Sequence, residues 1–302
     1  MERNCEFERR VLSIQSHVVS GYVGNKSAIF PLQVLGFEVD YINSVQLSNH
    51  TGYKHIKGQR LNADELFELY EGLRLNNLLF YSHLLTGYIG TATFLKELVN
   101  IVKQLKEINP NLYYVCDPVL GDNNELYVPE ELLPIYRNDV IPLADLITPN
   151  QFEAELLTGV AIKTKEDAIE AINILHKSGV KTVVLSSVEL GTKENLTLLG
   201  SSLNGDEKTL ISLTFPKMSA VFTGSGDLFS ALLLAWMSKT NRNLKISCEK
   251  ALNTMQSVLK RTIDSKSDFN KGQGSPFEME LKIVQSKNDI ENPPSTLKCQ
   301  EL

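Results

Sequence analysis

Strand-like and helix-like segments alternate along most of this 302-residue chain, and this alternation limits the folds it can adopt. Short segments such as Arg10–Gln15 and Glu38–Asn43 have the apolar pattern of strands, whereas Ala63–Leu73 has apolar residues at helical spacing. A strand, a helix and a second strand in series form a βαβ unit with parallel strands. We therefore predict an α/β fold, a three-layer α/β/α sandwich whose central sheet is largely parallel.

The same alternation continues toward the carboxyl end of the chain. Further strands are predicted at Leu78–Leu85, Leu112–Cys116, Leu146–Thr148 and Thr182–Leu185, with a hairpin of Asn195–Leu199 and Thr209–Leu213 around Asn204-Gly205. Further helices are predicted between Gly24 and Gly36, and at Thr93–Lys106, Gln151–Leu157, Lys165–Lys177, Leu228–Met237 and Ile246–Ile263. We expect one domain over residues 1–286 and a loose, polar tail over 287–302, which contains Pro293-Pro294.

Composition excludes several classes of protein. The net charge of −6 and the pI near 5.5 argue against a general binder of nucleic acid or of anionic membranes. The longest apolar run, Leu228–Met237, is too short to span a bilayer, and the charged start of the chain does not resemble a secretory signal. The four cysteines (Cys5, Cys116, Cys248 and Cys299) are scattered, so we expect reduced thiols in a cytosolic protein.

A glycine-flanked turn, Gly224-Ser225-Gly226-Asp227, precedes the apolar run. Glycine allows a positive φ and a close approach of the backbone to a ligand. At the start of a helix, free N–H groups and the helix dipole make an anion site. Asp227 then has two interpretations: an acid that interacts favourably with the dipole, or a general base beside a bound phosphate.

Polar clusters follow several of the predicted strands. In open α/β sheets, ligands bind outside the carboxyl ends of the strands. The clusters are Ser16-His17, Thr86–Tyr88, Asp117–Asp122, Thr148–Asn150, Ser186-Ser187 and Gly224–Asp227. Because they recur at one edge of the predicted sheet, they indicate a single shared site.

Two groups of carboxylates in these clusters each have a structural and a functional interpretation. Asp117 and Asp122 lie five residues apart around Pro118 and Gly121, so the loop is able to turn both toward one Mg²⁺, or they are simply turn residues. Glu153 either completes a capping box with Asn150 or holds a phosphate or a magnesium-bound water.

Other motifs with a known mechanism are absent. The sequence contains no G-x-x-x-x-G-K-[ST] motif, no G-x-G-x-x-G motif after the first strand, and neither the H-R-D nor the D-F-G motif of protein kinases. The five histidines have no metal-ligand spacing. His17 and His50 lie in predicted loops near the proposed site, where they are placed to touch a ligand.

The motifs resemble those of a known family. Gly224-Ser225-Gly226-Asp227 resembles the G-[TS]-G-D signature of the ribokinase-like small-molecule kinases, and Asn150–Glu153 matches their N-x-x-E motif. Longer stretches resemble the animal-type pyridoxal kinases: Val11–Val18, Gly21–Asn25, Phe30–Gly36, Ser48–Tyr53, Tyr70–Leu73, Val115–Asp122 and Ile147–Leu157. The resemblance extends from about Arg10 to about Glu291 and implies a ribokinase-like fold for the domain of residues 1–286.

The resemblance also implies a reaction. Members of this family phosphorylate the 5′-hydroxymethyl group of pyridoxal, pyridoxine or pyridoxamine with ATP. By motif position, Asp227 is the general base, and the N–H groups of Gly224, Ser225 and Gly226 form the anion hole for the transferred phosphoryl group. This assignment agrees with the chemistry of phosphoryl transfer, which depends on positioning and charge stabilisation.

The remaining site residues are carried over by position from the same family. Ser16 and Thr51 match positions at the polar edge of the substrate ring, and Val23, Val45 and Tyr88 match its walls. Asp117, Asp122 and Glu153 match the magnesium and phosphate region, and Thr148 and Ser186 match a site for K⁺ or Na⁺. The nucleotide side comprises Tyr127, Asn150, Ser187, Met218, Ser219 and Ala220.

Some features depart from the family pattern or stay open. Ser225 stands where threonine is commonest, Ile89-Gly90 replaces polar or charged residues, and the loop after Asp122 is short. The resemblance implies a homodimer. A hydroxymethylpyrimidine kinase and a catalytically weak vitamin B6 binding protein are the alternative functions; the intact Asp227, Asp117 and Glu153 argue against the second.

Overall fold

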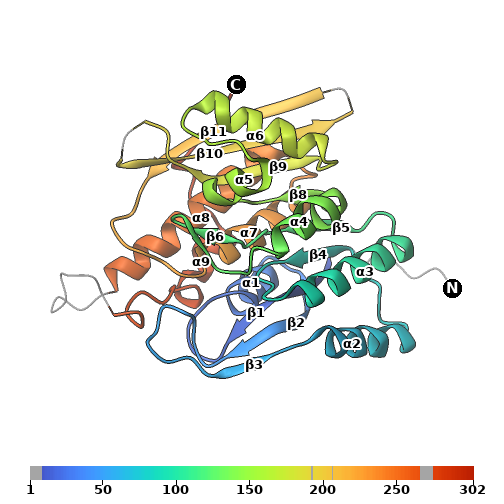
Figure 1. Cartoon of the computed structure of the whole chain (residues 1–302). Coiled ribbons are helices and arrows are strands. Elements are labelled where there is room, and N and C mark those ends of the chain that lie inside the picture. Colours follow the sequence, from blue (N-terminus) through green and yellow to red (C-terminus); the bar gives the residue numbers. More distant parts are fainter. Residues whose placement is uncertain (1–8, 192, 206, 266–274) are drawn as a thin grey trace.

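A ten-stranded sheet forms the centre of the computed structural model, which describes residues 9–191, 193–205, 207–265 and 275–302 (Figure 1). The strand order is β12-β11-β10-β9-β8-β5-β4-β1-β2-β3. The inner strands pair in parallel: β1 (Arg10–Val18), β2 (Glu38–Leu47), β4 (His83–Thr86), β5 (Tyr113–Cys116), β8 (Leu146–Ile147) and β9 (Thr182–Val188). The predicted, largely parallel sheet is therefore confirmed.

Both edges of the sheet are antiparallel. β3 (Gly58–Arg60) pairs with β2 at one edge. At the other edge, β10 (Asn195–Asn204) and β11 (Glu207–Pro216) form the predicted hairpin, and β12 (Gln300–Glu301) pairs with β11. A separate two-stranded ribbon, β6 (Gly121–Asp122) with β7 (Glu125–Leu126), follows β5.

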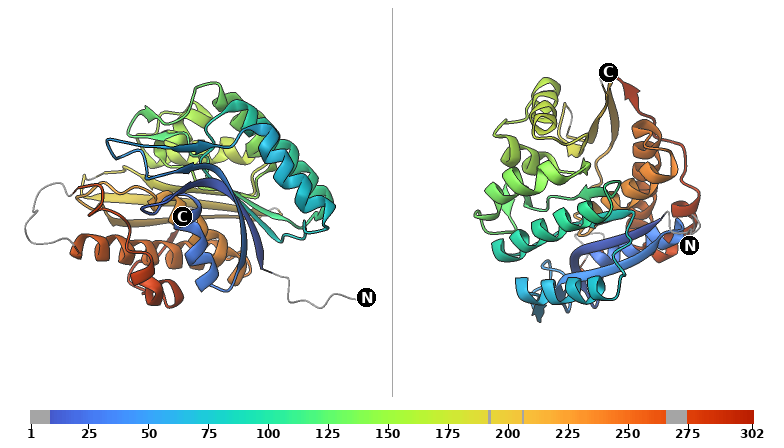
Figure 2. Two further views of the ribbon diagram at one scale, coloured as in Figure 1. Left: turned by 90° about the horizontal axis from the view of Figure 1, so that it is seen from below. Right: turned by 90° about the vertical axis from the view of Figure 1, so that its right-hand side faces the viewer.

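Helices cover both faces of the sheet, as Figure 2 shows. One face carries α2 (Ala63–Leu75), α3 (Ala92–Ile108), α4 (Leu132–Ile135), the π-helical turn η2 (Tyr136–Val140), the 3₁₀ turn η3 (Ile141–Leu143), α5 (Gln151–Thr158) and α6 (Lys165–Lys177). The other carries α1 (Asn25–Val34), α7 (Ser225–Lys239), α8 (Leu244–Asp264), the 3₁₀ turn η4 (Val284–Ser286) and α9 (Lys287–Glu291). The α/β/α sandwich predicted from the alternation is the observed architecture.

Neighbouring residues of the inner strands supply the two cores. Tyr113 packs with the α7 and α8 side, whereas Tyr114 packs with the α3 side, and Val184 and Val183 divide in the same way. This division follows from the two-residue period of a strand, and it explains why strands covered on both faces have continuous apolar runs. Every residue of Leu228–Met237 in α7 is buried, because the helix packs between the sheet, α1 and α8.

The carboxyl-terminal segment differs from the predicted loose tail. Residues 287–302 contain α9 and β12, and both Ile290 and Cys299 are buried. The Asn253 side chain on α8 accepts from the N–H of Leu297 at 2.9 Å and donates to its carbonyl at 3.0 Å. The segment therefore packs against α8 through these hydrogen bonds and through its buried residues. Because the buried residues form no periodic pattern, the sequence did not predict this packing.

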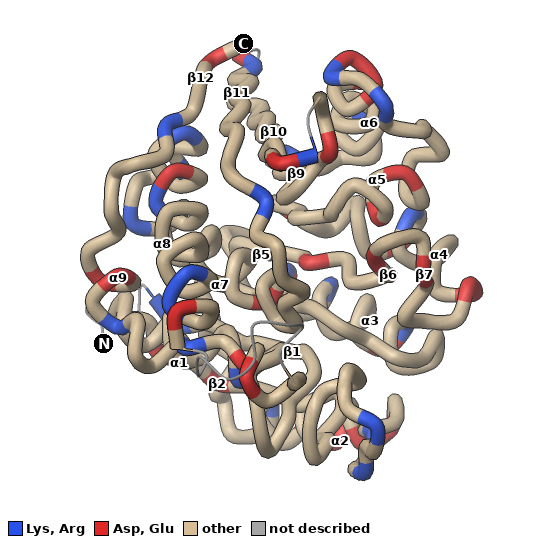
Figure 3. Tube along the Cα trace, turned by 90° about the vertical axis from the view of Figure 1, so that its left-hand side faces the viewer, with Lys and Arg blue, Asp and Glu red and all other residues tan. Residues whose placement is uncertain are grey.

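One helical region was not predicted from the sequence. Leu132–Leu143 forms three consecutive helical turns that periodicity does not predict, since Pro134 and Pro142 interrupt the pattern. Both α6 and α8 contain residues of both charge signs, as Figure 3 shows. Within the described part of the chain, every helix is too short or too polar to cross a bilayer.

Candidate active site at the carboxyl edge of the sheet

The predicted site residues lie where the parallel strands end. β1 has β2 on one side and β4 on the other, so the direction in which strands are added reverses at β1. Such a switch point is the usual ligand site of an open α/β sheet. Asp117 follows β5 and Thr148 follows β8, so the loops of these strands open on the same edge.

The amino-terminal end of α7 lacks a side-chain cap. Its capping residue, Gly224, has a left-handed φ of 84°, and a Cβ there would lie 2.0 Å from the carbonyl oxygen of Tyr22. Ser27 Oγ donates to the Gly224 carbonyl at 3.1 Å, which fixes the turn to α1. The N–H groups of the first turn of a helix have no partner within the helix, so this end offers donors to an anion.

The two glycines of the turn have different roles. Only Gly224 has the positive φ that favours glycine, and Gly226 does not share it. A Cβ at Gly226 would lie 3.7 Å from Asp117 Oδ2, an ordinary contact distance. The backbone constraint at Gly224 is therefore the stronger one, while Gly226 is exposed and leaves the approach to the helix end open.

Asp227 is fixed against the loop after β1. Its Oδ2 accepts the N–H of Gly24 at 2.7 Å. Gly24 itself has a φ of 54°, and a Cβ there would lie 2.0 Å from the Ser16 carbonyl oxygen. Burial raises the pKa of the Asp227 carboxyl above its usual value, and the Gly24 hydrogen bond opposes the rise. The carboxylate is thus oriented and made more basic than an exposed aspartate.

Asp117 is a second carboxylate at the same place. It is 5% exposed, and its Oδ1 accepts from Thr148 Oγ1 at 3.0 Å. Burial and then the negative charge of Asp227 raise its pKa. Hydrogen bonds to Asp117 and Asp227 offset the cost of burying the two carboxylates only in part. Two such carboxylates provide the kind of oxygen ligand that Mg²⁺ prefers. The described residues contain no cluster of three His, Cys, Asp or Glu side chains, so a cation here would need substrate oxygens or water as well.

Asp122 has a different environment. It lies on the β6–β7 ribbon, exposed, and its two carboxylate oxygens accept from the backbone and side-chain N–H groups of Asn123. Asp117 is buried at the end of β5 instead. Among the described residues, the structure shows no contact between the Asp117 and Asp122 side chains, which we expected to turn toward one point. The magnesium role of Asp122 stays a prediction.

The start of α5 is closed by its own side chains. The Asn150 side chain accepts the N–H of Glu153 at 2.9 Å, and Glu153 Oε2 accepts the N–H of Asn150 at 2.9 Å. Glu153 Oε1 also accepts the N–H of Leu120 at 3.0 Å, which ties the helix to the loop after β5. The capping box is therefore present. Burial, followed by the charge of Asp117, raises the pKa of Glu153.

The predicted nucleotide and monovalent-cation residues come from strand β9 and from the segments that follow β7, β8 and β11. Ser186 donates its N–H, at 3.0 Å, to the Pro149 carbonyl, which joins the ends of β8 and β9 next to the buried Thr148. Tyr127 is 54% exposed, and its N–H donates to the Leu120 carbonyl. Ser187 is half-buried, and the segment of Met218, Ser219 and Ala220 leads from β11 to the turn before α7.

The predicted ring pocket involves β2 and the loop after β4. Val23 and Val45 are buried, Tyr88 is half-buried, and Ser44 Oγ donates to the Tyr88 carbonyl at 2.8 Å. Ser16 lies at the end of β1 beside Gly24, whereas Thr51 is exposed on a separate turn.

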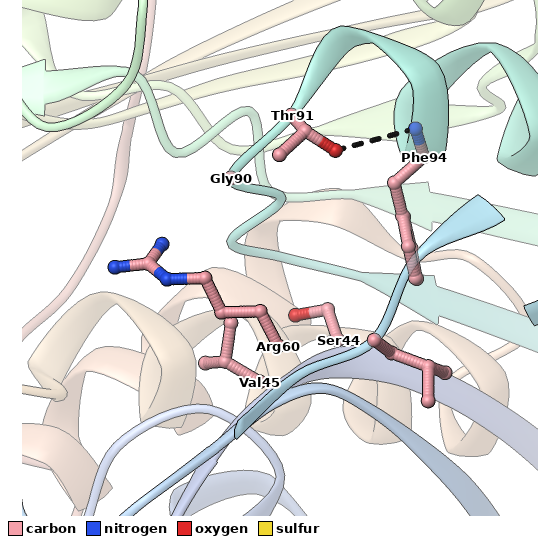
Figure 4. A pocket seen from close by; sticks show the side chains of 7 residues that line it. Ser44, Val45, Arg60, Gly90, Thr91 and Phe94 are labelled. Carbon is pink, nitrogen blue, oxygen red and sulfur yellow. Dashed lines mark hydrogen bonds between the residues drawn. The ribbon is translucent and has the colours of Figure 1, made fainter. Parts of the chain in front are cut away.

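A small groove next to these residues is lined in part by Gly90, one of the two residues at which the chain departs from the family pattern after Tyr88. Figure 4 shows it between β2, β3 and the loop with Gly90 and Thr91. A Cβ at Gly90 would lie 3.2 Å from the Tyr88 hydroxyl and 3.4 Å from Arg60 Nη1. Glycine at this position therefore leaves room for the guanidinium of Arg60 beside Tyr88.

Sequence analysis placed His17 in a loop, but it lies within β1, and sequence analysis did not assign the nearby Gln15 and Asn25. Within the described part of the chain, Oε1 of Gln15, Nδ1 of His17 and Oδ1 of Asn25 are buried and have no hydrogen-bond partner. Buried polar atoms are ordinarily paired, so these atoms indicate a place for water or ligand at the end of β1. Glu280, which binds the loop after β1 from the carboxyl-terminal segment, carried no sequence signal.

Comparisons with known proteins show the family of this chain. Residues 82–276 match the family model described as phosphomethylpyrimidine kinase. The chain is 53% identical to the pyridoxal kinase of Homo sapiens, over 97% of either chain. It is 51% identical to the pyridoxal kinase of Arabidopsis thaliana, over 96% of this chain and 94% of that protein.

A solved structure gives the same result for the fold. Pyridoxal kinase from Leishmania donovani, in complex with ADP and pyridoxamine, superposes with a TM-score of 0.91 and 36% identity. The match covers 97% of this chain and 99% of that one. These matches cover nearly the whole chain, and the chain belongs to the pyridoxal kinase family.

Proposed function

We propose that this chain transfers the γ-phosphoryl group of ATP to the 5′-hydroxymethyl group of pyridoxal, pyridoxine or pyridoxamine. The main support is the open start of α7, where the N–H groups of Gly224, Ser225 and Gly226 adjoin the oriented carboxylate of Asp227. The N–H groups stabilise negative charge on the phosphoryl group in transfer, and the helix dipole adds to this effect.

Asp227 acts as the general base in this proposal. Its Oδ2 accepts from Gly24, which leaves Oδ1 for the hydroxyl proton of the substrate. A base works best when its pKa approaches the working pH, and burial moves the pKa of Asp227 in that direction. Ser16 and Thr51 would hydrogen-bond the polar edge of the ring, with Val23, Val45 and Tyr88 as its walls.

The cation sites belong to the same proposal. Asp117 would hold Mg²⁺ directly or through water. Asp122, five residues further along the chain, and Glu153, which binds the same loop through the N–H of Leu120, would assist it. When bound, Mg²⁺ supplies neutralisation of phosphate charge. Thr148 and Ser186 would hold K⁺ or Na⁺, and Tyr127, Asn150, Ser187 and the segment 218–220 would contact the nucleotide. We further propose a homodimer located in the cytosol, without a nucleic-acid or membrane partner.

A side-by-side assay tests the proposed substrate. We expect the purified protein to form pyridoxal 5′-phosphate from pyridoxal and ATP with Mg²⁺, with a kcat/KM far above that for ribose, adenosine or hydroxymethylpyrimidine. A site that hydrogen-bonds the polar atoms of its substrate rejects analogues without them, because its own groups are then unpaired. The family model over residues 82–276 keeps hydroxymethylpyrimidine kinase as the second candidate. A preference for hydroxymethylpyrimidine would establish that candidate, and binding without turnover would indicate a B6 binding protein.

A further inference from the structure

Glu280 joins two loops that are far apart in the sequence. Its Oε2 accepts the N–H of Tyr22 at 2.9 Å, and its Oε1 accepts from the Tyr53 hydroxyl at 3.0 Å and lies 3.3 Å from His50 Nε2. The Glu280 and His50 side chains are only 7% and 8% exposed. A buried carboxylate with several donors from two loops fixes these loops relative to each other.

The surroundings are shaped to hold this carboxylate. Gly21 has a φ of 93°, and a Cβ there would lie 2.2 Å from Glu280 Oε1. His50 Nδ1 accepts the N–H of Gly52 at 3.1 Å, so the ring proton is on Nε2, where it points to Glu280. Tyr53 N–H donates to the His50 carbonyl, which closes the turn between the two side chains bound to Glu280.

Each of the two loops carries part of the proposed site. Thr51 is the exposed tip of the turn, between the anchored His50 and Tyr53. Tyr22 lies two residues before Gly24, whose N–H orients Asp227, and the Tyr22 carbonyl packs against Gly224. The turn with Thr51 and the loop that orients the general base are therefore held by one side chain.

We propose that Glu280 is a positioning residue for the phosphoryl acceptor: it sets Thr51 and the Tyr22–Gly24 loop at the spacing that the B6 vitamer requires. This inference rests on the proposed function. The nucleotide-side residues lie in β9 or follow β7, β8 and β11, and among the described residues Glu280 has its hydrogen bonds and its ion pair with Tyr22, Tyr53 and His50 instead. Its loss should therefore affect the acceptor and leave ATP binding unchanged.

Glu280→Gln tests this proposal because it keeps the size of the side chain. The neutral amide replaces one carboxylate oxygen with an N–H₂ group, so all three donors lose the charged partner and at least one loses its acceptor. We therefore expect the KM for pyridoxal to rise about tenfold or more, with the KM for ATP unchanged. A residue with only a structural role would reduce the fraction of active enzyme, which lowers the apparent kcat and the Tm but leaves the KM for pyridoxal unaltered. Glu291→Gln is the matched control, because Glu291 is an exposed carboxylate of the same segment and pairs with Lys287.

Tyr53→Phe provides a second, milder variant that removes one hydrogen bond to Glu280 Oε1. We expect a smaller rise in the KM for pyridoxal alone, and no further rise when it is added to Glu280→Gln. If Glu280→Gln does not fold, Tyr53→Phe decides by itself. An unchanged KM for pyridoxal, or an equal rise in both KM values, overturns the positioning role while the function stands. A wild-type protein that does not phosphorylate pyridoxal overturns the function and this inference together.

Discussion

The starts of α5 and α7 lie at the same edge of the sheet, yet they are built in opposite ways. At α5, Asn150 and Glu153 satisfy each other's backbone N–H groups, and Glu153 accepts a further N–H from Leu120. At α7, Gly224 provides no side chain, and the carboxylate of the first turn, Asp227, accepts from Gly24 in another loop. The first end is closed by protein groups, whereas the second is left open to a ligand.

This difference shows what decides whether a helix start is structural or functional. Both ends have a positive dipole and an acid in the first turn. Only α7 combines free N–H donors with a first-turn carboxylate that accepts from another loop. The buried Asp117 lies close to the acids of both helix starts. An anion can therefore bind at the start of α7, while both oxygens of the acid at α5 already accept backbone N–H groups.

The largest expected effect tests the cation part of this comparison. Asp117 and Asp227 are neighbouring carboxyl groups beside the open end of α7, and the charge of Asp227 raises the pKa of Asp117. A polyphosphate should therefore bind there only with cations that neutralise the ionised carboxylates. We expect no turnover after EDTA treatment, recovery with Mg²⁺, and clear stimulation by K⁺ relative to choline. Full activity in metal-free buffer without potassium would show that the carboxylates do not bind cations.

Asp227→Asn tests the open end itself. The variant keeps the shape of the side chain but loses the proton acceptor, so we expect kcat at saturating substrates to fall about 10²- to 10⁴-fold. The control is Asn150→Ala at the closed end, which should lower the free energy of unfolding by about 1 kcal/mol through loss of the cap. Its kcat should exceed that of Asp227→Asn. The comparison fails if Asp227→Asn retains near wild-type kcat.

A smaller effect on stability is expected when one glycine of the turn before α7 is replaced, and none when the other is. Gly224→Ala places a Cβ 2.0 Å from the Tyr22 carbonyl at a positive φ, so the backbone must move. We expect a loss of about 2 kcal/mol of stability, typical of strain at a special backbone conformation. Gly226→Ala, with ordinary contact distance, should fold like the wild type. Equal chemical-denaturation midpoints for the two variants would argue against the constraint at Gly224.

The smallest effect concerns the pH dependence of stability. Burial and the charge of Asp227 raise the pKa of Asp117, so its ionisation destabilises the folded state. The free energy of unfolding should then fall as pH rises from the unfolded pKa through the folded pKa. At mildly alkaline pH, Asp117→Asn should therefore be more stable than the wild type by on the order of 1 kcal/mol, and the difference should vanish near pH 4. A difference that does not depend on pH would contradict the raised pKa.

Sequence patterns predicted the elements with strong local signals. α6 has the predicted bounds, Lys165–Lys177, because Thr164 and Asp167 form a capping box at its start. β3 and β12 were not predicted, since each has only two or three residues and exists because a neighbouring strand offers it a free edge.

The candidate site was predictable in part for the same reason. The glycine turn and the strand-end polar clusters are local features, and the structure places them at one edge. The contact of Asp227 with Gly24 spans 203 positions and that of Glu280 with Tyr22 spans 258, so no local pattern reports them. The tertiary fold alone brings these residues together.

A crystal structure with ADP, aluminium fluoride and pyridoxal tests the central claim most directly, because the fluoride complex mimics the phosphoryl group in transfer. The account predicts fluorides about 3 Å from the backbone N–H groups at Gly224–Gly226, with the Asp227 carboxylate beside the 5′-hydroxyl of pyridoxal. The closed start of α5 should then make no backbone contact with the fluorides through the N–H groups capped by Asn150 and Glu153. A fluoride complex located away from the start of α7, or Asp227 turned from the hydroxyl, would contradict the account.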